Sequence, residues 1–272
     1  MPRLFRGSRI VALFAIVASL PIGLAAPSHA AVKYPFQQIS ASVSGVSITV
    51  KTYYEGTGPV TLTIGTGANV AATAVKSVTV SRGFTNSYTL TAPRLNAHST
   101  YYYMLTASDA TPYVSPGPVH TPIRDVSVSY RTLWVISDGD GWPKGCGDFY
   151  FTFEMDYYNK YTSQMCLNDG DTVPVPNNHT GYEPGNLSSP DYKYTSIEMS
   201  FWAFDDDRCY CLAESDQCDG YFDWQSTVCG DLAYKYWNAD LVAAGKTHHT
   251  VEVVGEGVDV KTDYYLTVTY HW

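Results

Sequence analysis

Two loops rich in aspartate and glycine carry the side chains best suited to chemistry. Hard cations such as Ca²⁺ take six to eight oxygen ligands, which such loops supply. Two carboxylates about 4 Å apart repel by about 4 kcal/mol at an effective dielectric of 20, so a bound cation would relieve the repulsion. Arg208 is the only basic residue beside the triple aspartate of the second loop. If the loops converge they predict a Ca²⁺ site; otherwise the acids are solvated turn residues. The candidate ligands are Asp138, Asp140 and Asp148 in the first loop, and Asp205, Asp207, Asp216 and Asp219 in the second, with Asp206 as a substitute.

The spacing in the first loop excludes an EF-hand. Counted from Asp138, the fifth position is Trp142 and the twelfth is Phe149, and neither supplies the required oxygen. Trp142 lies in the glycine-rich part of this loop, so it is the best candidate for an exposed ligand contact. The other tryptophans of this half are mostly expected in the core.

The six cysteines all lie in the second half of the chain, in or near the acidic loops. In a secreted protein they predict up to three disulfides, with fifteen possible pairings. A zinc cluster is the alternative, but Cys209-x-Cys211 has the wrong spacing for a zinc knuckle. No C-x-x-C redox motif occurs. The cysteines are Cys146, Cys166, Cys209, Cys211, Cys218 and Cys229.

The first thirty residues have the pattern of a secretory signal peptide. Three arginines precede an apolar run over residues 10–26, which ends in Ser28-His29-Ala30. The small residues Ser28 and Ala30 predict cleavage after Ala30. The run contains Pro21 and Gly23 and is shorter than a membrane-spanning helix requires. We therefore expect a secreted, extracellular protein with no transmembrane segment after cleavage.

Charge divides the remaining chain into two parts. Residues 31–124 contain six basic and two acidic residues, whereas residues 125–272 contain eight basic and twenty-four acidic residues. The cysteines follow the same division, so we expect a domain of residues 31–124 and a disulfide-rich domain of residues 125–272. The net charge of −9 counts against nucleic acid as a partner. The hydrophobic content of 45% is sufficient for folded cores.

Apolar and polar residues alternate repeatedly through residues 38–112, which predicts a small antiparallel sandwich. Leu95 and the run Thr100-Tyr101-Tyr102 indicate a turn from which a tyrosine returns its hydroxyl to the backbone. On these residues and the strand that ends at Asp109, residues 36–122 resemble a fibronectin type III domain. The tryptophan usual on its second strand is absent, and Tyr53 or Tyr54 stands near that place. The resemblance implies a spacer or interaction module.

The second half also alternates, and we expect an all-β protein of two tandem β-sandwich domains with at most one short helix. The apolar spacing over residues 232–244 predicts that helix. An aromatic strand after Asp148 and a hydrophobic strand that ends at Asp205 resemble the calcium-dependent sandwich of the protein-kinase-C-conserved (C-two) type over residues 126–225. This resemblance implies Ca²⁺ as a cofactor, with Asp140, Asp148, Asp205, Asp207 and Asp216 as ligands and Asp138, Asp206 or Asp219 as substitutes.

Three classes of function remain open. No nucleophile-elbow, zinc-protease or phosphate-loop motif occurs, and His248-His249 is the one histidine pair near possible carboxylate partners. The leading hypothesis is a secreted, non-catalytic binding or adhesion protein for an extracellular polysaccharide, protein or cell surface. A small calcium-dependent hydrolase is the second hypothesis. A structural protein that assembles into a surface coat or filament is the third.

Overall fold

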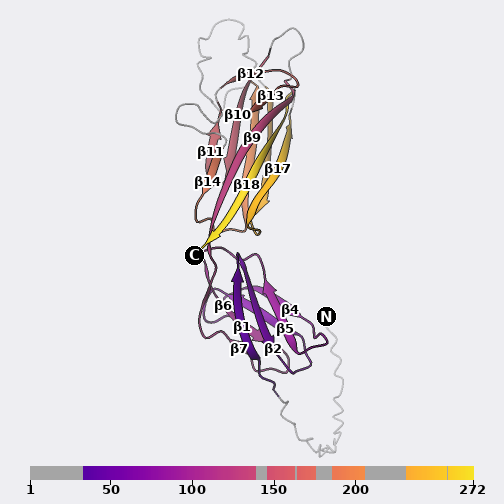
Figure 1. The fold of residues 1–272 in the computed structure, drawn as a ribbon, viewed down its shortest axis with the longest axis vertical. Helices are drawn as coiled ribbons and strands as arrows, with labels where there is room; N and C mark the ends of the chain where they lie inside the picture. Colours follow the sequence, from indigo (N-terminus) through magenta and orange to yellow (C-terminus); the bar gives the residue numbers. More distant parts are fainter. Residues whose placement is uncertain (1–32, 139–145, 163, 176–185, 206–230, 256) are drawn as a thin grey trace, which may run out of the picture. The chain divides into compact units, whose positions relative to one another are not determined.

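The computed structural model describes residues 33–138, 146–162, 164–175, 186–205, 231–255 and 257–272 (Figure 1). These residues form eighteen β-strands and no helix, so the described chain is all-β, as the sequence predicts. None of this described part could span a membrane as a helix.

Eight strands lie between residues 37 and 120. One sheet has the order β1-β2-β5, and the other has the order β4-β3-β6-β7 with β8 also paired to β6. All of these pairings are antiparallel. The strands are β1 (Gln37–Ser44), β2 (Ser47–Tyr53), β3 (Val60–Gly65), β4 (Ala74–Val80), β5 (Ser87–Ala92), β6 (Thr100–Thr106), β7 (Tyr113–Val114) and β8 (Val119–His120).

The core of this first sandwich contains the turn contact that the sequence predicts. The hydroxyl of Tyr101 accepts a hydrogen bond from the backbone N–H of Asn96 at 3.0 Å. Leu95 beside it is buried, and Tyr54 is fully buried and stacked on Phe36 with ring centroids 4.9 Å apart. Tyr54 therefore supplies a large aromatic core side chain immediately after β2.

Ten further strands form the second sandwich. The sheet with the order β11-β10-β15-β16, with β12 also on β10, is called here the β10/β15 sheet. The sheet with the order β13-β9-β18-β17, with β14 also on β9, is called the β9/β18 sheet. The strands are β9 (Ile123–Ser137), β10 (Gly147–Met155), β11 (Tyr158–Tyr161), β12 (Met165–Leu167), β13 (Thr172–Pro174), β14 (Asn186–Ser189), β15 (Ser196–Asp205), β16 (Asp231–Asp240), β17 (Gly245–Val254) and β18 (Asp259–His271).

Strict alternation builds the second core. Along β10 the odd-numbered residues from Gly147 to Met155 are buried and the even-numbered residues are partly exposed. The inward phenylalanines stack on one another, with Phe153 and Phe201 5.3 Å apart between centroids. No residue is shared between this cluster and the hydrophobic cluster of the first sandwich. The division at residue 124/125 itself stays a prediction.

The helix expected over residues 232–244 is a strand instead. Residues 231–240 are β16, and β17 begins at Gly245. Ala233 and Ala239 are buried, whereas Tyr234 and Tyr236 are exposed. This is a period of two, and aromatic side chains favour a pleated surface over a helix.

Candidate functional site

The outward face of the β10/β15 sheet carries an exposed aromatic surface. Cross-strand register aligns its side chains in rows, because directly paired residues point to the same face. Three rows run across β10, β15 and β16: Glu154–Ser200–Tyr236, Thr152–Trp202–Tyr234 and Tyr150–Phe204–Leu232. Tyr161 of β11 extends the middle row through its pairing with Thr152.

Three rings at the centre of this surface contact one another. Trp202 and Tyr234 are stacked, with centroids 4.9 Å apart and planes at 22°. Tyr236 stands edge-on to both, at 5.4 Å from Trp202 and 5.9 Å from Tyr234. Tyr234 is 54% exposed and Tyr236 is 49% exposed. We call Trp202, Tyr234 and Tyr236 the aromatic platform.

A chain of hydrogen bonds links the Trp202 indole to the neighbouring row. The indole Nε1–H of Trp202 donates to the hydroxyl of Ser200 at 2.8 Å, and that hydroxyl donates to a carboxylate oxygen of Glu154. Ser200 is almost fully buried. The indole orientation is therefore set by polar contacts as well as by packing.

Negative charge lies beside the platform. The pKa of the Tyr236 hydroxyl is raised, first by burial, then by the carboxylate of Glu154, by Tyr234 and by the carboxylate of Glu198. Deprotonation of Tyr236 would add a third anion to this corner of the sheet. The phenol therefore stays a neutral hydrogen-bonding group next to two acids.

This arrangement is suited to binding rather than to bond cleavage. Tyrosine and tryptophan present a flat apolar face and a polar edge, so they can stack on an apolar ring and hydrogen-bond to its substituents. Four neighbouring strands of about 4.8 Å spacing carry the middle row over about 14 Å, which is longer than one ring. A row of this length suits an extended ligand.

Sequence reasoning placed the tryptophans of this half mostly in the core, but none of the described ones is fully buried. Trp134, Trp202 and Trp237 are partly buried, and Trp272 at the end of the chain is exposed. The alternation of Leu232, Tyr234 and Tyr236 with Ala233 was the signal that could have revealed the platform. The helical interpretation of the same residues concealed it.

The acidic loops are only partly described. Asp138, Asp148 and Asp205 lie within the described residues, whereas Asp140, Asp206, Asp207, Asp216 and Asp219 lie outside them. Asp138 is 5% exposed and Asp205 is 0% exposed. Asp205 pairs with the buried Phe149 and faces inward, whereas Asp148 is the residue before Phe149 on β10 and faces outward. The side chains of Asp148 and Asp205 therefore project from opposite faces of the same sheet.

The described residues do not by themselves complete a metal site. Within the ranges that the structure covers, no three His, Cys, Asp or Glu side chains are grouped so that they could hold a metal ion. Gly147 gives the Asp205 carboxylate its room, because a Cβ at this glycine would lie 2.7 Å from Asp205 Oδ2. The backbone N–H of Asp138 donates to Asp169 Oδ1 at 2.6 Å, which joins the first loop to the β12–β13 turn.

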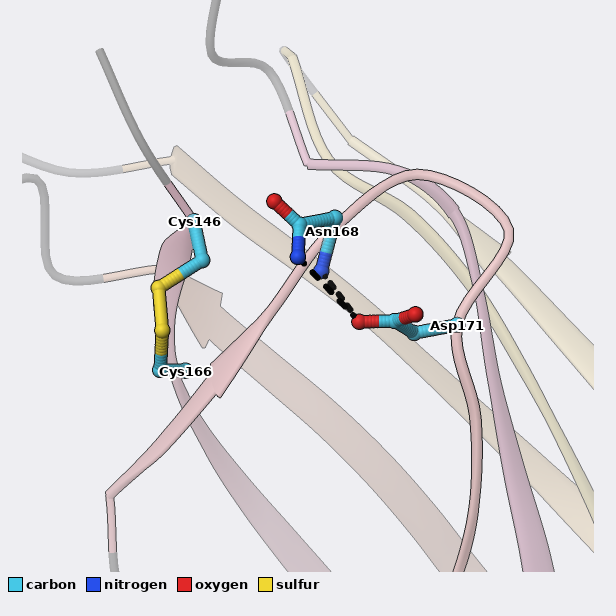
Figure 2. Close-up of a disulfide and its surroundings, with 4 residues drawn as sticks. All are labelled: Cys146, Cys166, Asn168 and Asp171. Atoms are coloured by element: carbon cyan, nitrogen blue, oxygen red, sulfur yellow. Dashed lines mark hydrogen bonds between the residues drawn. A yellow bond between two sulfur atoms is a disulfide. The ribbon is translucent and has the colours of Figure 1, made fainter.

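One disulfide joins Cys146 to Cys166 and so removes most of the pairings that the sequence allows (Figure 2). It links Cys146, the residue before β10, to Cys166 of β12. In the register of the two strands, Cys166 pairs with Asp148. The turn that follows is closed by Asp171, whose Oδ2 accepts the backbone N–H of Asn168 at 2.8 Å. Trp142 and the remaining cysteines, Cys209, Cys211, Cys218 and Cys229, lie outside the described residues.

The histidine pair does not form a nucleophile–histidine–acid relay. His248 Nε2 lies 2.9 Å from Asp263 Oδ2 on the β9/β18 sheet. The neighbouring hydroxyl, that of Thr247, contacts His249 instead, at 2.7 Å. The two halves of a possible relay therefore belong to different histidines.

Comparison with known proteins gives structural likenesses only. No protein-family model and no curated protein sequence matches the chain. A structure of the paired C2 domains, A and B, of Extended-Synaptotagmin 2 matches with a TM-score of 0.29 and 7% identity, covering 98% of this chain and 100% of that one. The calcium-bound form of those domains matches with a TM-score of 0.30 and 7% identity, covering 87% and 95%. Human GIVD cytosolic phospholipase A2 matches with a TM-score of 0.26 and 9% identity, covering 83% and 33%. The fibronectin type III resemblance of residues 36–122 stays a prediction.

Proposed function

We propose that this protein is a secreted, non-catalytic binding protein whose β10/β15 sheet binds an extracellular polysaccharide. The observation that carries the proposal is the aromatic platform of Trp202, Tyr234 and Tyr236, whose rings contact one another on the outward face of the sheet. Aromatic faces offer sugar rings an apolar surface, and the phenol and carboxylate groups around them offer hydrogen bonds. The signal-peptide pattern of residues 1–30 supports the extracellular location.

A glycan array followed by isothermal titration calorimetry tests this function on the full secreted chain. Trp202→Ala and Tyr234→Ala should each weaken binding to the best polysaccharide by about tenfold or more, as expected for aromatic hot spots at an interface. Both residues lie on the solvent face, so the variants should keep their far-UV circular dichroism.

The matched control is Tyr265→Ala. Tyr265 is also an outward-facing tyrosine, but on β18 of the opposite sheet. Its variant should bind as the wild type does. Equal loss in Tyr265→Ala and Tyr234→Ala would contradict a site on the β10/β15 sheet, and no binding to any polysaccharide would contradict the proposed function.

Calcium is proposed as a stabilising ion at the loop end of the second sandwich. Two carboxylates, those of Asp138 and Asp205, are buried there, and carboxylate oxygens are the ligands that Ca²⁺ prefers. Asp138 and Asp205 would contribute to the ion from the described part of the chain. Calorimetry of chelator-treated protein with CaCl₂ tests this, with Asp138→Asn as the variant and Asp156→Asn in the exposed β10–β11 turn as the control. Absence of heat at millimolar Ca²⁺ would exclude the site.

A further inference from the structure

At the outward positions of the described strands β10, β15 and β16, the charged side chains are all acidic. The outward positions of β10, β15 and β16 from Asp148 to Glu154, from Glu198 to Phe204 and from Leu232 to Asn238 include three carboxylates and no lysine or arginine. The acids are Asp148, Glu154 and Glu198. Glu154 and Glu198 are the two that act on Tyr236 of the platform.

Lys235 of β16 and Lys160 of β11 are the lysines nearest in sequence to the platform residues. On their strands, they alternate with the outward positions that form the rows. Lys235 pairs with the buried Phe201, and its Nζ lies 3.4 Å from the carbonyl oxygen of Glu252 on β17. Lys160 pairs with the buried Phe153 on β10. Neither lysine stands in a row with the platform, so the rows themselves carry only negative charge.

The opposite sheet of the same sandwich shows a different use of aromatic rings. Lys246 Nζ lies 3.9 Å from the centroid of Tyr265, and Lys261 Nζ lies 5.5 Å from the Trp134 ring. A cation over an aromatic face is attracted by the ring quadrupole. On the β9/β18 sheet, the protein therefore supplies cations for its own exposed rings.

Tyr234 and Tyr236 of the platform differ from this pattern. Within the described ranges, no lysine or arginine stands over Tyr234 or Tyr236. Their side chains are about half exposed, and Glu154 lies in the same cross-strand row as Tyr236. Rings with negative faces beside two acids are complementary to a ligand that brings positive charge.

We infer that the polysaccharide bound by the β10/β15 sheet is cationic, namely a polymer of unacetylated amino sugars. This inference rests on the proposed function and specifies its ligand class. The sugar rings pack against the exposed sides of Tyr234 and Tyr236, and the ammonium groups pair with the carboxylates of Glu154 and Glu198 in charge-assisted hydrogen bonds. Sulfated or uronic-acid polymers are disfavoured by repulsion from the same carboxylates.

The probes are glucosamine and N-acetylglucosamine oligomers of equal length, titrated into the full secreted chain under conditions in which the free amines are protonated. These probes share the sugar ring and differ in charge. The glucosamine oligomer should bind about tenfold or more tightly, and its advantage should shrink as salt is raised. Equal affinity for the two oligomers, or tighter binding of the acetylated one, would overturn the inference while leaving the proposed function intact.

Charge-removing variants assign the preference to this face. Glu154→Gln and Glu198→Gln keep shape and hydrogen-bonding capacity, so each should reduce the preference for the glucosamine oligomer several-fold. Glu252→Gln, on β17 of the opposite sheet, is the matched control and should keep the full preference. An equal loss for both oligomers, or a preference unchanged in both variants, would overturn the inference. Absence of binding to every polysaccharide would instead be the failure of the proposed function.

Discussion

The indole of Trp202 lies stacked on the phenol ring of Tyr234, with 4.9 Å between centroids and 22° between planes. The two residues face each other directly in the register of β15 and β16. Both side chains are thus positioned by the sheet before any ligand arrives. Preorganised aromatic side chains lose little conformational entropy on binding, which is why the platform is suited to an extended ligand.

The hydroxyl of Ser200 should be needed for the stability of the platform. Ser200→Ala removes the acceptor of the Trp202 indole N–H and the donor to Glu154. We expect the free energy of unfolding to fall by about 1 kcal/mol, the usual net value of such hydrogen bonds. Urea denaturation followed by tryptophan fluorescence measures this. Ser196→Ala, an exposed serine of the same strand, is the control, and equal stability of both variants would argue against the hydrogen-bond chain.

The Cys146–Cys166 disulfide should contribute strongly to the stability of the second sandwich. It closes a segment with a sequence separation of 20, for which loss of the bond costs about 3 kcal/mol in the chain-entropy model. The double variant Cys146→Ser/Cys166→Ser should therefore show a lower urea midpoint. Peptide mapping without reduction should recover the two cysteines in one linked fragment, and linkage of either to another cysteine would contradict the pairing.

The first sandwich should lose stability in acid through Asp109. Its pKa is lowered, first by the hydrogen bond from the Tyr54 hydroxyl and then by the backbone N–H of Thr57, whose nitrogen lies 3.0 Å from Oδ2. A lowered folded-state pKa means that the stabilisation is present above the unfolded pKa near 3.8 and is lost as pH falls through the lower folded value.

Asp109→Asn should therefore reduce the urea midpoint at pH 7 and flatten its decline below about pH 4. Tyr54→Phe should change the pH dependence in the same direction, because it removes the main cause of the lowered pKa. Glu55→Gln, at an exposed position next to Tyr54, is the control. An Asp109→Asn profile parallel to the wild type would contradict this role.

Asp259 should have the opposite effect at neutral pH. Its pKa is raised, first by desolvation and then by the carboxylate of Glu252, and its Oδ1 is buried without a hydrogen-bond partner among the described residues. A carboxyl whose pKa is higher in the folded state than in the unfolded state stabilises the folded state at low pH. This contribution to the free energy of unfolding is lost as pH rises through the folded-state pKa. Asp259→Asn should therefore raise the urea midpoint at pH 7. Glu252→Gln should raise it less, and a lower midpoint in Asp259→Asn would show that the carboxylate is stabilising.

Alternation of side chains determined the fold class from the sequence alone. The runs around Val46–Val50 and Phe149–Phe153 predict strands because one side of each pleat must be buried, and the structure has strands there. Leu95 and Tyr101 likewise predicted a turn in which a tyrosine hydroxyl contacts the backbone, and Tyr101 makes this local contact with Asn96. A local pattern is readable when the interacting residues are near one another in the chain.

Long-range pairing was decided only by the tertiary structure. The sequence allowed fifteen cysteine pairings, and the register of β10 with β12 brings Cys146 to Cys166. The segment of residues 232–244 fits helical and strand periods alike, and pairing with β15 selects the strand. The sequence did not show that Trp202 is on the solvent side. Alternation assigns each residue of a strand to one of two faces, but it does not say which face the core covers. The packing of the β10/β15 sheet against its own core leaves Trp202 on the solvent side with Tyr234, and that choice creates the candidate site.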